Sequence, residues 1–321
     1  MYLGSIVGLF SIMFVDSQME STMAIDGEDA LIDFFFKNRT NHGLVLDRES
    51  DRTTVSVAST GFGMDCWAIA AQKNKISRQQ AIDYVNKAID VTIKANPTEN
   101  RGWLYHFTWP DGRPKECCEI STVDTAIFYS GALQAAQRLA DVATQRKVQK
   151  LINSVDISWM MKNGLFCHGA MYSNNGHSFL GPLWDTNSEG VLVYKLFSVP
   201  FKPLDVRYDL PLFVYFYPLC FYNDYELEEH LHKAIDWQFD KYGHCGVTAC
   251  HGPFGYQIND SSIISPVSLF GISRLSKKVD NFLNKLPVHK TTVGYCVRNG
   301  WRSRDKYGID YGSALLLLNR K

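Results

Sequence analysis

Asp124 is the residue whose setting most directly suggests chemistry. It follows Ser121 and Thr122, either of which can cap a helix, and it precedes a run that is apolar or small on nearly every face. An ionisable side chain at the mouth of such an enclosed helix costs free energy to desolvate unless it is paired or used in a reaction. The alternative is a first-turn carboxylate that makes only local hydrogen bonds, and this stretch alone gives both interpretations equal weight.

A second acidic residue, Glu189, stands just before another largely apolar helix, which we predict over residues 191–199. The stretch that leads to it, residues 163–183, is rich in Gly, Asn and Ser, and we predict a loop there. Loops of this length inside a compact domain are usually functional. The end of this loop is therefore a second candidate position for chemistry.

Aromatic residues make up 13% of the chain, a surplus that suits a site where flat ligands stack. Trp103, Tyr105, Trp109 and Trp184 lie beside predicted loops, and each is either a stacking platform or a core residue. From their clustering we favour Trp184 and one of the other three as platforms. His106 is a candidate for binding a hydroxyl group, and a buried, hydrogen-bonded histidine is the equal alternative.

Histidine and cysteine gather once in the chain, at residues 244–245 and 250–251. This spacing does not match the usual zinc patterns, so we favour ordinary loop packing and expect neither a metal nor a cofactor. The other cysteines are scattered, and we expect most of the eight to be buried thiols.

Apolar periodicity predicts an all-α fold of about eleven or twelve helices, in which enclosed helices alternate with amphipathic ones. Such alternation indicates two concentric rings, an (α/α)6 barrel whose aromatic and polar loops gather at one end. We predict one such domain over residues 28–321, after an N-terminal segment of residues 1–27. The main predicted helices cover residues 28–37, 55–71, 76–96, 121–133, 143–154, 191–199, 212–221, 224–241, 264–275 and 314–318.

Charge gives no support for a nucleic-acid partner, because 33 basic and 33 acidic residues cancel and no run of basic residues is present. Residues 3–15 are apolar and resemble a signal-peptide core, and they are too short to span a membrane. We therefore expect a secreted or periplasmic protein with no membrane span. The sequence leaves its oligomeric state open.

Seven motifs carry a resemblance to a known family. They cover residues 43–48, 56–63, 105–107, 119–133, 184–194, 246–256 and 308–312. In this order and spacing they resemble the glucoamylase-like (α/α)6-barrel family, which includes endo-β-1,2-glucanases and the transglycosylating domain of cyclic β-1,2-glucan synthases. The resemblance runs from about residue 28 to the C-terminus.

The resemblance implies a glycoside hydrolase or transglycosylase acting on a β-glucan, with an oligo- or polysaccharide as substrate. Such chemistry uses two carboxyl groups. Glu189 and Asp124 match acidic positions of the family. We expect Glu189 to be the general acid and Asp124 the base, acting directly or through a relay of water and substrate hydroxyls. The substrate-binding residues that the resemblance and the loop positions suggest are Asp47, Arg48, Trp103, Tyr105, His106, Trp184 and Asp185.

Three alternatives stay open at this point. The family's β-1,2-glucanases carry a further acid one turn before the Asp124 position, where this chain has Ser121, and this favours a catalytically silent carbohydrate-binding protein. Glu119 cannot replace that acid on the same face if the helix is regular there, because it lies about 500° of rotation away.

Asp185 is equally well explained as a helix N-cap, and Asp47 with Arg48 as an ion pair that closes a loop. A polysaccharide lyase is a third class, although no Tyr/His pair is singled out.

Overall fold

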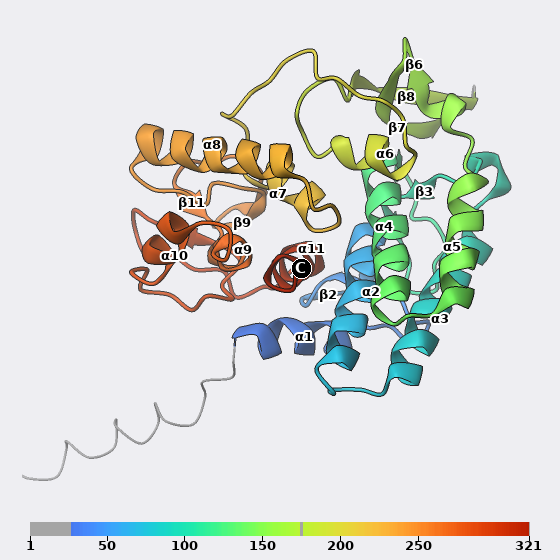
Figure 1. Cartoon of the computed structure of the whole chain (residues 1–321), viewed down its shortest axis with the longest axis horizontal. Coiled ribbons are helices and arrows are strands. Elements are labelled where there is room, and N and C mark those ends of the chain that lie inside the picture. Colours follow the sequence, from blue (N-terminus) through green and yellow to red (C-terminus); the bar gives the residue numbers. More distant parts are fainter. Residues whose placement is uncertain (1–26, 174–175, 321) are drawn as a thin grey trace, which may run out of the picture.

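Eleven α-helices form the framework of the chain in the computed structural model, which describes residues 27–173 and 176–320. Six of them make an inner ring in which nearly every residue is buried: α2 (Val57–Gln72), α4 (Thr122–Arg138), α6 (Val191–Leu196), α7 (Phe213–Leu219), α9 (Pro266–Ile272) and α11 (Gly308–Leu318). Contacts run from α2 through α4 and α6 to α7, and α11 touches α7, α9 and α2, which closes the ring. Figure 1 shows α11 between α2 and α9.

Five amphipathic helices cover the outside of the ring. They are α1 (Gly27–Lys37), α3 (Arg78–Ala95), α5 (Val142–Asn153), α8 (Tyr225–Tyr242) and α10 (Lys277–Leu283). Each packs against an inner neighbour, for example α3 on α2, α5 on α4 and α8 on α7. Between α6 and α7, the position of a sixth outer helix is taken by an extended segment, residues 197–212. The two-ring arrangement expected from the sequence is confirmed.

Two glycines set the closest contact inside the ring. A Cβ atom on Gly131 of α4 would lie 2.0 Å from the carbonyl oxygen of Gly61 in α2, and a Cβ on Gly61 would lie 2.7 Å from the carbonyl oxygen of Ile127. Only glycine allows the two backbones to approach this closely. The glycines inside the apolar pattern therefore pack α2 against α4, so that the first turns of both helices lie at the same end of the barrel.

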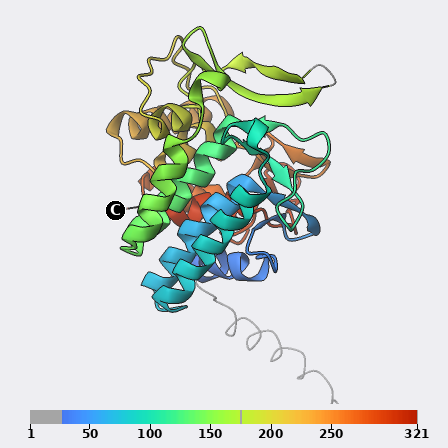
Figure 2. The same cartoon turned by 90° about the vertical axis from the view of Figure 1, so that its right-hand side faces the viewer.

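Short strands replace several predicted loops, so the all-α expectation holds for the framework and not for the connections. Residues 163–183, predicted to be a loop, form most of a hairpin between β7 (Leu165–Ser173) and β8 (Gly176–Leu183). Figure 2 shows this hairpin projecting from one end of the helical body. Because β8 is mostly exposed and rich in Gly and Ser, it lacks the alternating apolar pattern that identifies a strand.

The remaining strands are short and lie around the loops of the barrel. A five-stranded sheet joins β7 and β8 to β3 (Leu104–Tyr105), β5 (Ile120–Ser121) and β6 (Met161–Lys162). The other sheets contain β1 (Leu46–Arg48), β2 (Asp51–Ser56) and β4 (Phe107–Thr108); β9 (Cys250–Gly252) and β10 (Gly255–Gln257); and β11 (Ile263–Ile264) and β12 (Tyr295–Cys296).

Most predicted helices are confirmed, with shifts at their ends. The helix predicted over residues 191–199 ends at Leu196, α10 was not predicted, and α11 begins six residues before the predicted start at residue 314. None of the helices in the described residues is long and apolar enough to cross a membrane. The signal-like segment, residues 3–15, lies outside the described residues.

Candidate active site

First-turn residues of the inner helices meet around one cavity of about 470 Å³. Ala58 of α2, Val123 of α4, Phe213 of α7 and Ile309 of α11 all line it, and so does Glu189, which stands just before α6. The backbone N–H groups and positive dipole ends of these helices therefore gather at one place, which favours negative charge there. The other lining residues are Asp47, Arg48, Ser56, His106, Phe107, Asp124, Ile127, Tyr217, Ala249, Tyr256, Ile258 and Tyr307.

Asp124 is the third residue of α4, and Ser121 is the N-cap. The Ser121 hydroxyl accepts a hydrogen bond from the backbone N–H of Asp124 at 3.2 Å and donates one to Asp124 Oδ2 at 2.5 Å. Burial raises the pKa of Asp124, while the nearby His106 ring and the Ser121 hydroxyl act in the opposite direction. The serine at this position thus supports a carboxylate on the cavity wall.

Glu189 lies in the turn before α6, and part of its side chain is exposed to the cavity. Burial, followed by the negative charge of Asp124, raises its pKa to about 8, although His106 opposes this shift. At neutral pH Glu189 therefore carries a proton. The structure brings Glu189 and Asp124, the two residues predicted to do chemistry, to the same cavity, in different electrostatic surroundings.

Trp184 connects the Glu189 turn to the start of α4. Its Nε1–H donates to Thr122 Oγ1 at 2.9 Å, and a Cβ on Gly190 would lie 2.5 Å from its ring, so the turn is packed directly on the indole. The opposite neighbour is His168, whose ring stacks on the indole at 3.6 Å. Trp184 is only 8% exposed, so its part in this structure is to hold Glu189 against α4 and not to offer a face to a ligand.

His106 lies between two carboxyl groups. Its Nδ1 is 2.6 Å from Glu119 Oε1 and its Nε2 is 3.7 Å from Asp124 Oδ1, while Phe107 stacks on the ring at 3.8 Å. Burial lowers the pKa of His106, but Asp124 and Glu119 together outweigh burial and raise it to about 9. His106 is therefore an imidazolium at neutral pH, and it bridges Glu119 to Asp124.

The rotation that separates Glu119 from Asp124 assumed a regular helix over both residues, and the structure has no helix at Glu119. The helix begins only at Thr122, and the two residues before it belong to β5, which pairs with β3 and β7. Glu119 therefore follows the strand geometry and not the helical period. The His106–Glu119 contact is also held by the backbone, because the His106 N–H donates to the Glu119 carbonyl at 3.0 Å.

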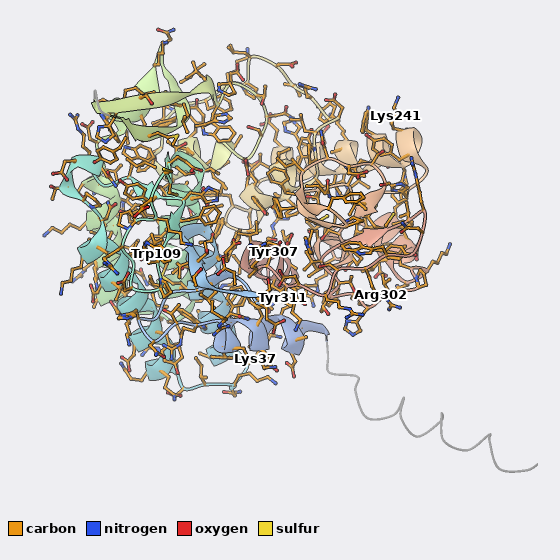
Figure 3. The ribbon with its side chains drawn as sticks, turned by 180° about the vertical axis from the view of Figure 1, so that it is seen from behind. Lys37, Trp109, Lys241, Arg302, Tyr307 and Tyr311 are labelled. Carbon is orange, nitrogen blue, oxygen red and sulfur yellow. The ribbon has the colours of Figure 1, made fainter. Side chains whose placement is uncertain are left out.

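Asp47 and Arg48 both line the cavity, as predicted for substrate contacts. Burial raises the pKa of Asp47 to about 6, against the opposing charges of His106 and Arg48. Arg48 donates from Nη1 to the Tyr307 hydroxyl at 3.3 Å. Figure 3 shows Tyr307 near the centre of the face seen from behind.

Asp310 is a further carboxyl group, and sequence analysis did not select it. It occupies the first turn of α11, is 2% exposed, and its Oδ2 is buried without a hydrogen-bond partner. Burial, and secondarily Asp47, raise its pKa well above the usual value. Its charge also affects the pKa values of the cavity residues Tyr217 and Tyr256. The sequence could have identified Asp310 by its likeness to Asp124, since both are acidic residues in the first turn of an enclosed helix.

The other predicted binding residues lie outside the cavity lining. Trp103 is fully buried and donates from Nε1 to the Asp156 carbonyl, so it cannot stack on a ligand. Tyr105 is 8% exposed and packs beside Tyr172, and Trp109 is 39% exposed on the outer surface. Asp185 is not the N-cap of α6, because that helix begins six residues later. The aromatic residues that do line the cavity are Phe107, Phe213, Tyr217, Tyr256 and Tyr307.

Within the described residues, no group of three or more His, Cys, Asp or Glu side chains is arranged to hold a metal ion. His251 pairs through Nδ1 with Ser303 Oγ at 2.8 Å, and Cys250 accepts a hydrogen bond from Gln257. The prediction of mostly buried thiols is confirmed: Cys117 is exposed, Cys118 is half-buried, and the other six are buried.

Comparison with known proteins finds likeness in structure only. No family model matches the sequence, and no curated protein does. Among solved structures, the endo-β-1,2-glucanase from Chitinophaga pinensis, in complex with sophorotriose and glucose, is similar over 91% of this chain and 90% of its own, with a TM-score of 0.73 at 16% identity.

Two further solved structures agree with this. The β-1,2-glucanase from Parabacteroides distasonis matches over 91% of this chain and 56% of its own, with a TM-score of 0.70 at 14% identity. The endo-β-1,2-glucanase from Talaromyces funiculosus, in complex with sophorose, matches over 91% and 84%, with a TM-score of 0.61 at 11% identity. The chain therefore has the glucoamylase-like (α/α)6 fold that the sequence motifs implied.

Proposed function

We propose that the protein is a glycoside hydrolase acting on a β-glucan, and that β-1,2-glucan is the first substrate to test. The observation that carries this proposal is the pair of carboxyl groups at one cavity, a protonated Glu189 and an Asp124 supported by Ser121 and His106. Glycosidic bond cleavage needs one carboxyl group that gives a proton and one that takes a proton. The similar β-1,2-glucanase structures support the choice of substrate.

Glu189 is the general acid in this proposal. It gives its proton to the glycosidic oxygen as the bond to the anomeric carbon breaks, and its raised pKa of about 8 keeps the proton available at neutral pH. Asp124 takes a proton from the attacking water, directly or through a chain of water and substrate hydroxyls. The imidazolium of His106, 3.7 Å from Asp124 Oδ1, stabilises the ionised form of Asp124 before the reaction.

The serine at position 121 is compatible with catalysis. Its hydroxyl donates to Asp124. Glu119 contacts His106, the imidazolium that lies beside Asp124. The site therefore keeps a network of acidic groups around the base without an acid at position 121. This favours an active enzyme over a silent binding protein.

Asp310 is the structure's other candidate for the base, because its unpartnered Oδ2 lies beside cavity residues. Asp124 is the better choice on two grounds. It lines the cavity, and a hydroxyl and an imidazolium stabilise its ionised form, whereas burial raises the pKa of Asp310 well above its usual value. Variants of both residues separate the two assignments.

The test is product release from a panel of soluble glucans, β-1,2-glucan included, by the wild-type protein and by the variants Glu189→Gln, Asp124→Asn and Asp310→Asn. We expect Glu189→Gln and Asp124→Asn to lose about 10³-fold or more in kcat, the scale of general acid–base catalysis. Glu229→Gln, which removes an exposed carboxylate of α8, is the matched control and should retain full activity. Loss in Asp310→Asn with retention in Asp124→Asn would transfer the base to Asp310.

Binding separates the remaining outcomes. Calorimetric binding of a glucan without any release would point to a silent carbohydrate-binding protein. A panel with neither release nor binding would reject the β-glucan as substrate. The anomeric configuration of the first product, followed by NMR, tells whether the reaction inverts or retains.

A further inference from the structure

A second hollow adjoins the candidate active site. It encloses about 950 Å³ and shares one residue, Arg48, with the cavity that contains Glu189. We call it the arginine groove. Its lining residues are Arg48, Glu49, Ser50, His251, Trp301, Arg302, Ser303, Arg304 and Asp305. Arg48 therefore lies at the junction of the two hollows.

The acidic residues of the groove already have partners. Glu49 Oε2 is 3.1 Å from Lys306 Nζ, and Asp305 accepts hydrogen bonds from the backbone N–H of Ser50 at 3.1 Å and from its hydroxyl. Lys306 neutralises Glu49, whereas Asp305 keeps its charge, which acts on Arg48. The three arginines of the groove still outnumber this one carboxylate.

The arginine side chains of the groove have fewer partners than its carboxylates. Arg302 and Arg304 are exposed, and neither makes an ion pair with any residue that the structure describes. Arg48 Nε is buried and has no hydrogen-bond partner. Three guanidinium groups thus face one hollow with donors to spare. Figure 3 shows Arg302 to one side of Tyr307.

The segment that carries these arginines is fixed by its backbone. Cys296 N–H donates to the Trp301 carbonyl at 2.8 Å, and Ser303 N–H donates to the Gly294 carbonyl at 2.8 Å. His251 lies beside the indole of Trp301 at 5.9 Å and bonds to Ser303 Oγ at 2.8 Å. The groove is therefore a built surface with an aromatic side, a favourable surface for the C–H face of a sugar.

We propose that the arginine groove binds anionic sugar units, which carry a carboxylate or phosphate group, of the same glycan that is cleaved at Glu189. This inference rests on the proposed function. Guanidinium groups match carboxylate and phosphate oxygens with paired hydrogen bonds, and the Trp301 ring matches the sugar face. A neutral glucan would cover the same arginines without supplying a counter-charge, which costs desolvation. The enzyme thus prefers acidic or acid-substituted β-glucans to neutral ones.

The first test does not depend on the glycosidic linkage. Protein labelled with 5-fluorotryptophan is titrated separately with glucose, glucuronate and glucose 6-phosphate, and the Trp301 resonance, assigned with Trp301→Phe, is followed by ¹⁹F NMR. We expect both anionic sugars, or one of them, to bind at least about tenfold more tightly than glucose at low salt, the ratio that one charged hydrogen-bond pair supplies. The preference should shrink in 0.5 M NaCl. Comparing glucuronate with glucose 6-phosphate separates the carboxylate from the phosphate.

The double variant Arg302→Gln/Arg304→Gln should lose this preference, and Arg298→Gln is the matched control, since it lies on the same segment but outside the groove lining. Equal binding of glucose and the two anionic sugars, or an unchanged preference in the double variant, would overturn the proposal. Because Glu189 takes no part in this measurement, an anion preference that disappears in the double variant stands even if no glucan is hydrolysed. Hydrolysis without the preference would leave the proposed function intact and reject the groove.

Discussion

The surroundings of Glu189 oppose the ionisation of its carboxyl group. Burial and Asp124 raise its pKa to about 8, so an enzyme that uses it as the acid should lose activity as this proton leaves. We expect the alkaline limb of kcat/KM against pH to fall near pH 8, and the acid limb to lie above the ordinary Asp pKa of 3.8, because the pKa of Asp124 is raised. A rate profile on any cleaved glucan checks this. Full activity at pH 10 would contradict the assignment of Glu189.

The same shift has a consequence for stability. The carboxyl of Glu189 has a folded-state pKa of about 8 against its ordinary value of 4.5, so its protonated form favours folding. The contribution is fully present below about pH 4.5 and is lost as the pH rises through 8. Glu189→Gln cannot ionise and should therefore unfold at a higher temperature than wild type at pH 9, by roughly 1–2 °C for each 1 kcal/mol in a domain of this size.

Calorimetry at pH 4.5 and pH 9 measures this difference. We expect the two proteins to unfold at nearly the same temperature at pH 4.5, where Glu189 is protonated in the folded state and only half ionised in the unfolded state. If the unfolding temperatures of the two proteins differ equally at both pH values, the amide acts through packing and not through the lost charge. Glu229→Gln, on the surface of α8, serves as the control for a carboxylate without a raised pKa.

Glu119 is the residue that keeps His106 charged from the side away from Asp124. Its Oε1 lies 2.6 Å from His106 Nδ1, and together with Asp124 it raises the pKa of His106 to about 9. Replacing it by Gln removes one negative charge, so the pKa of His106 should fall toward the ordinary histidine value of 6.5. The imidazole Cε1–H signal, followed by NMR from pH 5 to 10, reports this directly.

Glu116→Gln is the control, because Glu116 is exposed three residues earlier. In Glu119→Gln we expect a lower kcat at pH 8 with part of the loss restored at pH 6.5, where His106 is protonated again. A merely structural role for Glu119 would reduce the rate equally at both pH values. The pH dependence therefore distinguishes a charge effect from a folding defect.

At the scale of elements, the sequence predicts helices that show apolar periodicity. It does not predict short strands that form only by pairing with distant segments. α2 and α4 were predicted because their residues are enclosed, and the structure shows that Gly61 and Gly131 let the two helices pack closely. The strand geometry at Glu119 was not predicted, because β5 has only two residues and pairs with strands that are distant in sequence. Two residues are too few to show the alternation of a strand. Composition alone also cannot tell Trp103, a core residue, from Tyr307, which lines the cavity.

The contact between α2 and α4 also contains a buried ion pair. Arg138 Nε lies 2.8 Å from Asp65 Oδ1, and Gln134 Nε2 donates to Asp65 Oδ2 at 2.7 Å. Asp65 is fully buried, and burial raises its pKa to about 6 despite Arg138. Arg138→Met would leave the carboxylate without its counter-charge, and we expect this to cost about 3–5 kcal/mol of unfolding free energy, measured by urea denaturation.

The double variant Asp65→Asn/Arg138→Met gives the matched comparison, since neither partner is then charged. We expect it to recover a large part of the lost stability. Both residues lie away from the cavity lining, so kcat of each variant at 20 °C should equal that of wild type. A double variant no more stable than Arg138→Met alone would show that packing of the arginine stem, and not its charge, supports this contact.

At the scale of the whole molecule, the arrangement of the rings was predictable and the assembly of the site was not. The alternation of enclosed and amphipathic helices is a local property of each segment, so it can be read from the sequence. The site instead collects Asp47, His106, Asp124, Glu189 and Asp310 from five separate parts of the chain. Only ring closure brings them together, and the extended segment between α6 and α7 shows that the ring tolerates a missing outer helix.

Ring closure depends on α11, which contacts α2 near the start of the chain and α9 near its end. If residues 28–321 are one domain, as the sequence predicts, a change in α11 must destabilise both halves together. Leu316 of α11 is fully buried and does not line the cavity. Leu316→Ala should cost about 3 kcal/mol, within the range for a buried leucine, and should lower the midpoint of a single unfolding transition.

Hydrogen exchange measures the two halves separately. In Leu316→Ala, the slowest-exchanging amides of α2 and of α8 should lose protection by the same free energy, because they open in one global event. Leu204→Ala, at a residue 77% exposed in the extended segment, is the control and should leave both unchanged. Loss of protection confined to α8 and its neighbours would divide the chain into two folding units. The cavity would then lie at a junction between them, and its geometry would depend on how they dock.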